Sequence, residues 1–463
     1  MKKQVSFSLS FLFLLCFFSC YTGNKKQPIL TRDLQAIKDS GVINVITLYS
    51  STSYFIYKGE PMGYEYELMK DFAESQGLKI NIKIAPNITR LTEMLLDGEG
   101  ELVMYNIPIT NDLRNRVEYC GREMITQQVL IQRTGSKTPI LKDVIQLIGK
   151  EVWVKHDTRY FDRMQNLNKE LGGGIIVRDI EKDTVNTEDL IELVSIGKIP
   201  YTVSDDNIAR LNKTYYSNLD INLILSHPQR SSWAVRKDAT QLAEALDQWF
   251  TANQNTTRYK AIMKRYFETS KTPGEPVSEL GKLYDAGKIS PYDDLFRKYA
   301  VSMNKDWKLL ASIAYQESRF DTTGVSWAGA VGLMGLMPST AEAMGISADE
   351  RSLPEASIYA GTKYLTSIER SFKEIDNEED RIQFVLASYN AGMGHVFDAR
   401  ALARKYGKNP HSWHDVEEYI RLKSIPEYYN DEVCKHGYLR GSETTAYVRD
   451  VIRRWRYYQD KIK

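Results

Sequence analysis

The sequence predicts two domains of different fold class, an α/β domain followed by an all-α domain. Between residues 42 and 250, β-branched runs alternate with segments of helical periodicity, which is typical of an α/β domain with a largely parallel sheet. The segment 271–276, Lys-Thr-Pro-Gly-Glu-Pro, marks a junction, because proline and glycine interrupt both kinds of element. Beyond this junction the pattern is almost wholly helical. A chain of 463 residues also has the length of two or three domains.

The N-terminus predicts export and a lipid anchor. Two lysines precede an apolar run over residues 5–18, which is shorter than the ~20 residues that span a bilayer. We therefore expect a signal peptide over residues 1–19. Cys20 follows a serine directly, as in a bacterial lipobox, so we expect acylation of Cys20; a buried cysteine is the alternative. Residues 20–30 are polar and predict a tether to the folded body.

The α/β domain is predicted over residues 31–270. Its strands are recognised by β-branched or alternating apolar residues, and its helices by a spacing of three to four. Strands are expected at 42–48, 78–84, 102–105, 151–154, 201–203 and 233–236. Helices are expected at 67–76, 91–96, 187–196 and 241–250.

The all-α domain is predicted over residues 286–463, after a linker at 271–285. Its apolar residues follow helical spacing throughout, and no repeat of 20–50 residues is present. The clearest helices are expected at 307–315, 356–368, 382–389 and 445–458.

Composition and cysteine spacing exclude several classes of protein. A net charge of +1 gives no basic face of the kind that nucleic-acid binding requires. No Cys/His cluster has zinc-site spacing, so we expect neither metal nor cofactor. Cys120 and Cys434 fall in different predicted domains, so we expect no disulfide framework despite export.

Glu317 is the candidate catalytic residue. It ends an amphipathic helix in which Leu310, Ile313 and Glu317 share one face, so its carboxyl is expected at an apolar edge. Burial disfavours the charged form of a carboxyl group, and a general acid for a glycosidic oxygen must keep its proton. On the helix alone, a solvated glutamate is the simpler interpretation.

Four sequence blocks change that interpretation. They are Glu317–Phe320, Gly329–Thr340, Ala387–Gly392 and Glu443–Val448. In this order and spacing they resemble the soluble-lytic-transglycosylase family, which has a lysozyme-like helical fold, over about residues 290–459. The whole chain is more similar still to the membrane-bound lytic murein transglycosylase F type. That type places a periplasmic-binding-protein-like domain, of two α/β lobes, before the transglycosylase domain, and the stretch 287–296 supports the match.

The resemblance implies a substrate and a reaction. Peptidoglycan glycan strands would be cleaved at the MurNAc–GlcNAc β-1,4 bond without water, leaving 1,6-anhydroMurNAc ends. Glu317 would act as acid and then as base. The implied substrate-binding residues are Ser318, Gly332, Met334, Met337, Tyr389, Asn390 and Tyr447. The family usually has Gln where this chain has Gly335, so one substrate-contacting amide is missing.

A single catalytic carboxylate fits this chemistry. Ordinary glycosidases use two, whereas an enzyme with one can use the substrate's own 2-acetamido group. Asp321 is interpreted as a turn cap, and Glu443 as the start of the last helix.

The α/β domain carries a candidate regulatory site. The stretches 63–73 and 109–114 resemble amino-acid-binding periplasmic proteins, in which an arginine clamps a carboxylate and an acid meets the ammonium group. Arg114 and Asp205 fall near these positions, with Arg114 one residue later than the pattern. An amino acid or muropeptide is the expected ligand, and lobe closure would then gate the catalytic cleft. A surface arginine and an N-cap are the alternatives.

Two other functions remain open. A muramidase would use the same glutamate with water, and a non-catalytic peptidoglycan-binding lipoprotein would fit the change at Gly335. A receptor for an importer leaves the helical domain unexplained. The expected location is the periplasmic face of the outer membrane, reached through the lipid anchor at Cys20.

Overall fold

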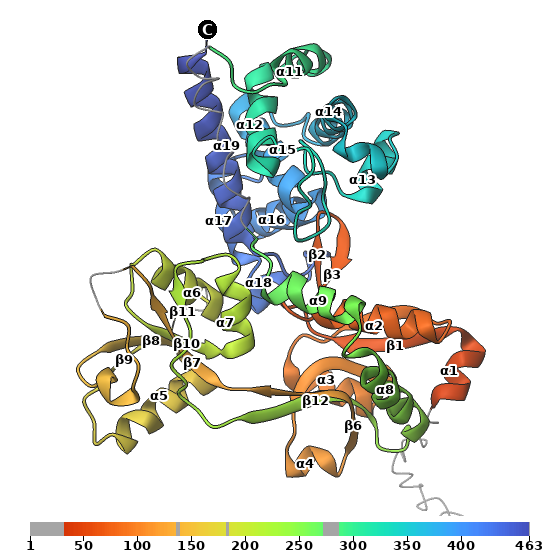
Figure 1. The fold of residues 1–463 in the computed structure, drawn as a ribbon, viewed down its shortest axis with the longest axis vertical. Helices are drawn as coiled ribbons and strands as arrows, with labels where there is room; N and C mark the ends of the chain where they lie inside the picture. Colours follow the sequence, from red (N-terminus) through yellow and green to blue (C-terminus); the bar gives the residue numbers. More distant parts are fainter. Residues whose placement is uncertain (1–31, 136–138, 182–184, 272–286, 463) are drawn as a thin grey trace, which may run out of the picture.

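The computed structural model describes residues 32–135, 139–181, 185–271 and 287–462. The predicted signal peptide, Cys20 and all of the predicted linker except Lys271 lie outside these residues. Two α/β lobes lie side by side, and a helical domain stands against both of them (Figure 1). The predicted fold class is therefore confirmed. No helix within the described part of the chain is long and apolar enough to cross a membrane.

Lobe 1 is built on a five-stranded sheet of order β4-β1-β5-β12-β6. The run Val42–Thr47 forms its second strand because the β-branched residues Ile43, Val45 and Ile46 are fully buried there. The strands are β1 Val42–Thr47, β4 Lys79–Ile84, β5 Leu102–Pro108, β6 Val117–Thr126 and β12 Gln229–Arg236. The helices are α1 Leu34–Ser40, α2 Tyr64–Ser75, α3 Ile88–Leu96, α4 Asn111–Arg114, α8 Thr240–Asn253 and α9 Thr257–Phe267.

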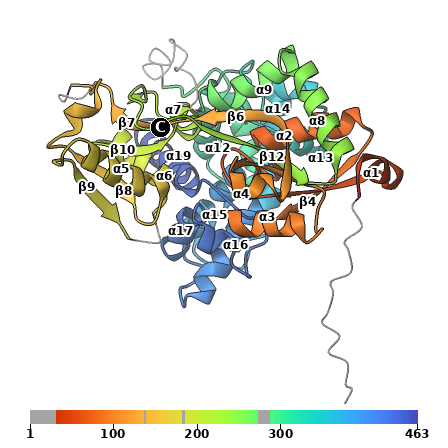
Figure 2. The same cartoon turned by 90° about the horizontal axis from the view of Figure 1, so that it is seen from below.

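Lobe 2 carries the second five-stranded sheet, of order β11-β7-β10-β8-β9. Its strands are β7 Gln128–Arg133, β8 Glu151–Lys155, β9 Ile176–Ile180, β10 Thr202–Asp205 and β11 Leu219–Asp220. Its helices are η1 Val144–Leu147, α5 Arg159–Glu170, α6 Thr187–Ser195 and α7 Asp206–Lys213. Figure 2 shows both lobes from below, with the helical domain behind them.

Each sheet is mixed, which corrects the prediction of a largely parallel one. Strands β1, β4 and β5 are parallel, as are β8, β9 and β10, whereas β12 and β7 are antiparallel to their neighbours. The chain crosses between the lobes twice, from β6 into β7 and from β11 back into β12. Successive parallel strands of one sheet need a crossover connection, usually a helix. Strands β7 and β12 each enter their sheet from the other lobe without such a crossover, so they can run antiparallel to their neighbours.

A short hairpin that the sequence analysis missed projects from lobe 1 towards the helical domain (Figure 1). It consists of β2 Phe55–Tyr57 and β3 Glu60–Met62, paired antiparallel. Lys58 and Gly59 form its turn with φ values of 50° and 83°. Two consecutive left-handed residues are the signature of a tight two-residue hairpin turn, whose twist matches that of the strands.

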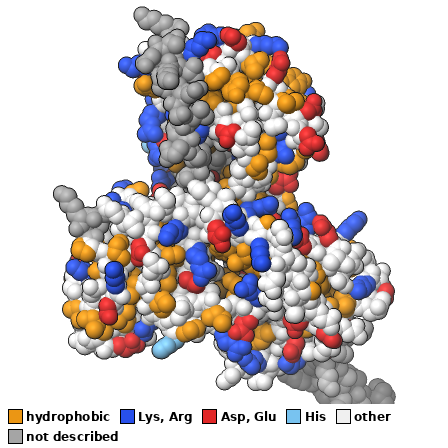
Figure 3. Space-filling view, in the orientation of Figure 1, with side chains coloured by type: hydrophobic (Ala, Val, Ile, Leu, Met, Phe, Trp, Pro, Cys, Tyr) orange, Lys and Arg blue, Asp and Glu red, His pale blue; other side chains and the backbone are white. Residues whose placement is uncertain are grey.

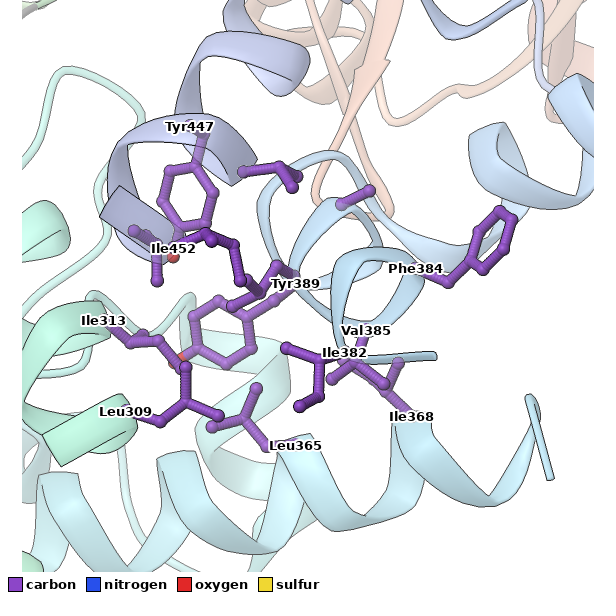
Figure 4. Packing of buried hydrophobic residues seen from close by; sticks show 14 of the residues in the cluster. Leu309, Ile313, Leu365, Ile368, Ile382, Phe384, Val385, Tyr389, Tyr447 and Ile452 are labelled. Atoms are coloured by element: carbon purple, nitrogen blue, oxygen red, sulfur yellow. The ribbon is translucent and has the colours of Figure 1, made fainter. Parts of the chain in front are cut away.

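The helical domain contains the remaining described elements. Its helices are α11 Asp293–Ala300, η2 Val301–Met303, α12 Trp307–Ser318, α13 Pro338–Met344, η3 Asp349–Ser352, α14 Pro354–Arg370, α15 Glu378–Ala391, α16 Met393–Lys405, α17 Trp413–Leu422, α18 Pro426–Tyr429 and α19 Gly441–Lys461. Helix α12 begins at the N-cap Asp306 and ends at Arg319, which adopts a left-handed conformation. Leu309 and Ile313 on α12 pack with Leu365, Ile382 and Ile452 from other helices (Figure 4). The core therefore fixes α12 from several sides.

Lobe 1 and the helical domain share one hydrophobic cluster. Trp327, from the loop between α12 and α13, is 8% exposed and belongs to the cluster that fills lobe 1. Its ring centroid lies 5.1 Å from that of Tyr57 and 6.2 Å from that of Tyr266. This loop is therefore held in place partly by lobe 1.

Candidate active site

A cleft of about 480 Å³ lies where the helical domain meets both lobes. Its walls come from the end of α12, the loop before α13, the start of α19, the hairpin, and lobe 2. Its lining includes Tyr57, Lys58, Glu192, Tyr215, Lys271, Gln316, Glu317, Ser318, Asp321, Gly332, Gly335, Asn390, Arg440, Glu443, Tyr447, Arg449 and Asp450.

Glu317 lies in this cleft at the last turn of α12, with its side chain 9% exposed. Its Oε1 accepts a hydrogen bond of 2.7 Å from the hydroxyl of Tyr447 on α19. Its Oε2 is 3.0 Å from Nζ of Lys58 at the tip of the hairpin. The catalytic candidate is therefore held by a phenol from its own domain and by an ammonium group from lobe 1.

Ser318 and the loop after α12 form one wall. The Ser318 hydroxyl lies 3.0 Å from the carbonyl oxygens of Ala314 and of Leu333, so it ties the loop to the helix. Gly332 and Gly335 also line the cleft, and both have positive φ. The structure brings Ser318 and Gly332 to the cleft, where the resemblance had implied them.

Gly335 sits directly against the catalytic candidate. A Cβ atom at this position would lie 2.3 Å from Oε2 of Glu317, with φ at 58°. No side chain fits there without displacing the carboxyl group, so glycine is required by this conformation. The carbonyl of Gly335 also accepts from Lys58 Nζ at 3.4 Å.

Tyr389, Asn390 and Tyr447 approach from α15 and α19. Tyr447 and Asn390 line the cleft, and Asn390 accepts a hydrogen bond of 2.9 Å from Thr444. Tyr389 is 2% exposed, and its hydroxyl donates to the carbonyl of Met334 at 2.6 Å. Figure 4 shows the Tyr389 and Tyr447 rings inside the packed core of the domain. Tyr389 therefore supports the loop from behind.

The Met334 and Met337 side chains, which the resemblance implied as substrate contacts, do not line the cleft in this structure. Met334 is 0% exposed and packs in the core of the helical domain. Met337 is 5% exposed and packs in the cluster of lobe 1. The positive φ values at Gly332 and Gly335 turn the loop so that its apolar side chains face away from the cleft.

The hairpin is fastened to the helical domain at several further points. His395 Nε2 lies 3.0 Å from the carbonyl oxygen of Ile56, and Ser339 hydrogen-bonds Glu60. A Cβ atom at Gly392 would lie 3.2 Å from the nitrogen of Gly59, so the hairpin tip rests directly on this glycine. Burial lowers the pKa of His395 to about 3, so its ring is neutral at ordinary pH.

Two ionisable residues that the sequence analysis did not assign to the cleft also line it. Glu443 was interpreted as a helix-start residue, and it does occupy the first turn of α19. Burial raises the pKa of its carboxyl, against the opposing effect of Arg440, Lys58 and Lys271. Burial lowers the pKa of Lys271 to about 7, and its ammonium group lies 4.1 Å from the Trp327 ring centroid. The sequence block Glu443–Val448, which begins with Glu443, could have indicated that this residue lies in the cleft.

Arg440 connects the helical domain to lobe 2 beside the cleft. Its guanidinium group lies 2.7 Å from Glu188 and 2.8 Å from the side-chain oxygen of Asn212. It also lies 3.9 Å from the Tyr215 ring centroid. Glu188 in turn accepts a hydrogen bond of 2.5 Å from Ser51 of lobe 1. One arginine thus joins all three parts of the molecule.

The predicted regulatory residues have other neighbours. Asp205 is 5% exposed and pairs with Arg159 of its own lobe. Arg114 is exposed on α4, where it acts electrostatically on Tyr119 and Glu123. The helical domain contacts lobe 1 elsewhere, through the end of α18: the Tyr429 hydroxyl lies 3.3 Å from the carbonyl oxygen of Tyr49, and the Asn430 side chain donates to the carbonyl oxygen of Pro86.

One group within the described ranges has the geometry to hold a metal ion, His156, Asp179 and Glu181. It lies on lobe 2, both carboxylates are exposed, and His156 Nδ1 is 3.0 Å from Asp179. A surface ion pair accounts for this contact. None of the three residues lines the catalytic cleft.

The sequence matches two family models. Residues 294–412 match the one described as Transglycosylase SLT domain. Residues 43–269 match Bacterial extracellular solute-binding proteins, family 3.

Relatives match along nearly the whole chain. A protein named membrane-bound lytic murein transglycosylase F from Desulfosudis oleivorans is 31% identical over 423 residues, 91% of this chain and 90% of the relative. A protein of the same name from Pseudomonas fluorescens (strain Pf0-1) is 30% identical over 423 residues, 91% of this chain and 85% of the relative.

Solved structures match the two lobes. The substrate-binding domain 2 of Lactococcus lactis GlnP, in open conformation, matches with a TM-score of 0.42 and 16% identity, over 50% of this chain and 96% of that one. The unliganded L-cystine solute receptor of Neisseria gonorrhoeae matches with a TM-score of 0.42 and 15% identity, over 51% and 96%.

Proposed function

The chain belongs to the membrane-bound lytic murein transglycosylase F family, and from this membership we propose that Glu317 is its catalytic acid and base. The protein is a lytic transglycosylase with a solute-binding-protein-like N-terminal domain. The alternatives of a hydrolytic muramidase and of a non-catalytic binding protein are not favoured. Its substrate is peptidoglycan.

The position of Glu317 supports its role. In the protonated form it would donate to the glycosidic oxygen between MurNAc and GlcNAc, and the bond to C1 of MurNAc would break. The substrate's 2-acetamido group would stabilise the positive charge at C1. The Glu317 carboxylate would then take the proton of the C6 hydroxyl, whose oxygen bonds to C1 and gives the 1,6-anhydro ring. The Tyr447 hydroxyl, 2.7 Å from Glu317 Oε1, would orient the carboxyl group through both steps.

The contact between Lys58 and Glu317 supports a regulatory role for the N-terminal domain. The Lys58 ammonium group lies 3.0 Å from Oε2 of Glu317 and so occupies an oxygen that would otherwise face the substrate. The hairpin tip also occupies space beside Gly335 and Gly392 that substrate would need. The domain would thus hold the enzyme inactive until a movement of lobe 1 withdraws the hairpin.

An amino acid or muropeptide bound near Arg114 and Asp205 would supply that movement if it preferred the withdrawn state. Asp205 would then have to leave Arg159, its present partner, or bind the ligand together with it. The contacts of Tyr429 and Asn430 with lobe 1 would couple a movement of that lobe to the helical domain.

The relatives are named membrane-bound, which supports membrane attachment. Acylation of Cys20 would supply it, with the folded domains on the periplasmic side of the outer membrane. Substitution of Cys20 by Ser should release the protein into the soluble fraction, and membrane retention of this variant would contradict a lipid anchor.

Mass spectrometry of the products tests the proposed reaction. Purified sacculi are digested with the protein lacking residues 1–20, and with its Glu317→Gln variant. We expect 1,6-anhydro-muropeptides from the parent and a loss of about 10²–10⁴-fold in the variant, the usual contribution of a general acid. Reducing-end products would instead indicate a muramidase. Equal product from the folded variant would exclude Glu317 as the acid.

A further inference from the structure

Two arginines next to residues of the cleft rim, although not in its lining, have no anionic partner among the described residues. Arg319 follows Ser318 directly, and Arg454 lies on α19 two turns beyond Tyr447. Their guanidinium carbons lie 4.4 Å and 3.8 Å from the centroid of the same ring, that of Tyr315. Neither forms an ion pair within the described ranges, and the Nε atom of each is buried without a hydrogen-bond partner.

These guanidinium groups can still bind through their terminal Nη groups, because both side chains are partly exposed although their Nε atoms are buried. A guanidinium group over an aromatic ring uses its face, while its N–H donors point outwards along its edge. Tyr315 is 8% exposed and packs in the core, so the ring is a fixed platform. Two rigidly placed donor edges with no internal acceptor suit a carboxylate supplied from outside.

Two further arginines extend the cluster along the cleft. Arg449 lines the cleft, and Arg453 follows one turn later on α19. Both contact Asp450, at 3.4 Å and 3.1 Å, and their side chains are 66% and 73% exposed. One carboxylate is thus shared between them. Lys and Arg side chains lie along the left edge of the upper domain in Figure 3, where α19 runs in Figure 1.

Asp321, an acidic residue of the cleft lining, does not neutralise the arginine cluster. Asp321 accepts from the backbone nitrogen and the hydroxyl of Thr323, both at 2.8 Å, and these bonds lower its pKa. It therefore stabilises its own turn. Among the described residues, Asp450 is the one carboxylate that forms ion pairs with any of these four arginines, so the cluster carries excess positive charge.

We propose that Arg319 and Arg454, aided by Arg449 and Arg453, bind the carboxylates of the peptide branch of peptidoglycan. This inference rests on the proposed function, because the peptide branch is carried by the MurNAc residue whose bond Glu317 would cleave. A branch next to the reacting sugar must pass close to the end of α12, and its free carboxylates match the arginine cluster in charge and geometry. The enzyme would then prefer peptide-bearing strands over bare ones.

The test compares two substrates that differ only in the branch. Glycan strands are prepared with their peptides and, from the same batch, after an amidase has removed them. The variants are Arg319→Gln/Arg454→Gln, Arg319→Lys/Arg454→Lys, and the control Arg404→Gln, an exposed arginine on α16 outside the cleft. The readout is kcat/KM on each substrate, with melting temperature as the check of folding.

We expect the parent and Arg404→Gln to prefer peptide-bearing strands by about tenfold, an effect within reach of two charge-assisted contacts. The Gln double variant should lose this preference while kcat/KM on bare strands stays unchanged, and the Lys double variant should keep part of it. A Gln double variant that retains the preference would overturn the inference. So would equal losses on both substrates, which would indicate a structural role.

Binding separates this inference from the proposed function. The affinity of each strand type is measured by titration calorimetry in a Glu317→Gln background, with and without the Arg319→Gln/Arg454→Gln change. Weaker binding of peptide-bearing strands alone supports the inference even if no variant releases anhydro ends, a result that would count only against the proposed reaction. Equal binding with and without the change overturns the inference.

Discussion

Lys58 Nζ lies 3.0 Å from Glu317 Oε2, although 258 residues separate the two in the sequence. The Lys58 and Glu317 side chains are 8% and 9% exposed, so solvent screens their attraction little. The tip of a lobe 1 hairpin therefore contacts the carboxyl group that we propose as the catalytic acid.

Substitution of Lys58 by Met should raise the rate of anhydro-product release by about tenfold, equivalent to ~1.4 kcal/mol in activation free energy. The change removes the ammonium group that occupies Glu317 Oε2 and keeps most of the side chain's length. Initial rates on sacculi measure the effect. Lys58→Arg should stay slow, and Lys79→Met, at an exposed site on lobe 1, should match the parent. A Lys58→Met protein that melts normally and is no faster would contradict inhibition by the hairpin.

Substitution of Tyr447 by Phe should lower kcat by about tenfold with little change in KM. The variant loses the 2.7 Å hydrogen bond to Glu317, and bonds to charged groups contribute ~1.5–3 kcal/mol. This bond is proposed to orient the catalytic acid. Since it lies within the protein and makes no contact with the substrate, its loss should lower kcat and leave KM nearly unchanged. A rise in KM alone would show that Tyr447 binds substrate instead.

Substitution of Gly335 by Ala should reduce activity at least tenfold, because the new Cβ would meet Glu317 Oε2 at 2.3 Å and turn the carboxyl away. The left-handed φ at this site should also cost about 1 kcal/mol of stability. Gly345→Ala is the matched control. It has φ at 91° and only Lys363 Nζ within 4 Å of the added Cβ, at 3.7 Å, so it should lose stability and keep activity. Equal activity of the two variants would show that a Cβ atom at position 335 does not displace the Glu317 carboxyl group.

The elements that sequence alone predicted are those specified locally. Glu317 was assigned to the end of a helix because its apolar neighbours repeat at helical spacing, and the motif blocks supplied Tyr447 and Asn390 by resemblance. Strand β1 was visible because its residues are β-branched and buried. For the helix and the strand the information lies within about ten residues, whereas for Tyr447 and Asn390 it lies in the order and spacing of the four blocks.

The contacts that escaped prediction join distant segments. Nothing in residues 53–60 indicates which surface the hairpin contacts, so the contact of Lys58 with Glu317 could not be predicted. The contact of Arg440 with Tyr215 could not be predicted for the same reason. The direction of the Met334 side chain could not be predicted for another reason. A motif names the residues of a loop, whereas positive φ values at the flanking glycines decide which side chains face the cleft.

Glu65 should make the stability of the protein fall between about pH 4.5 and pH 7. It is 3% exposed at the start of α2, and burial raises its pKa from 4.5 to about 7, against opposing hydrogen bonds from Ser53, Asn106 and Trp233. The folded state then keeps a proton that the unfolded state loses, so stability declines as pH rises through this window and is constant above it.

The decline attributable to Glu65 is on the order of 3 kcal/mol, since each pKa unit corresponds to 1.36 kcal/mol. Substitution by Gln mimics the protonated form, so the difference in free energy of unfolding between Glu65→Gln and the parent should grow in favour of the variant from pH 4.5 to pH 7. Urea unfolding followed by tryptophan fluorescence at several pH values measures it. Glu244→Gln, at an exposed position on α8, should show no such trend. A difference that is independent of pH would mean that Glu65 is ionised throughout and that its buried environment compensates the charge.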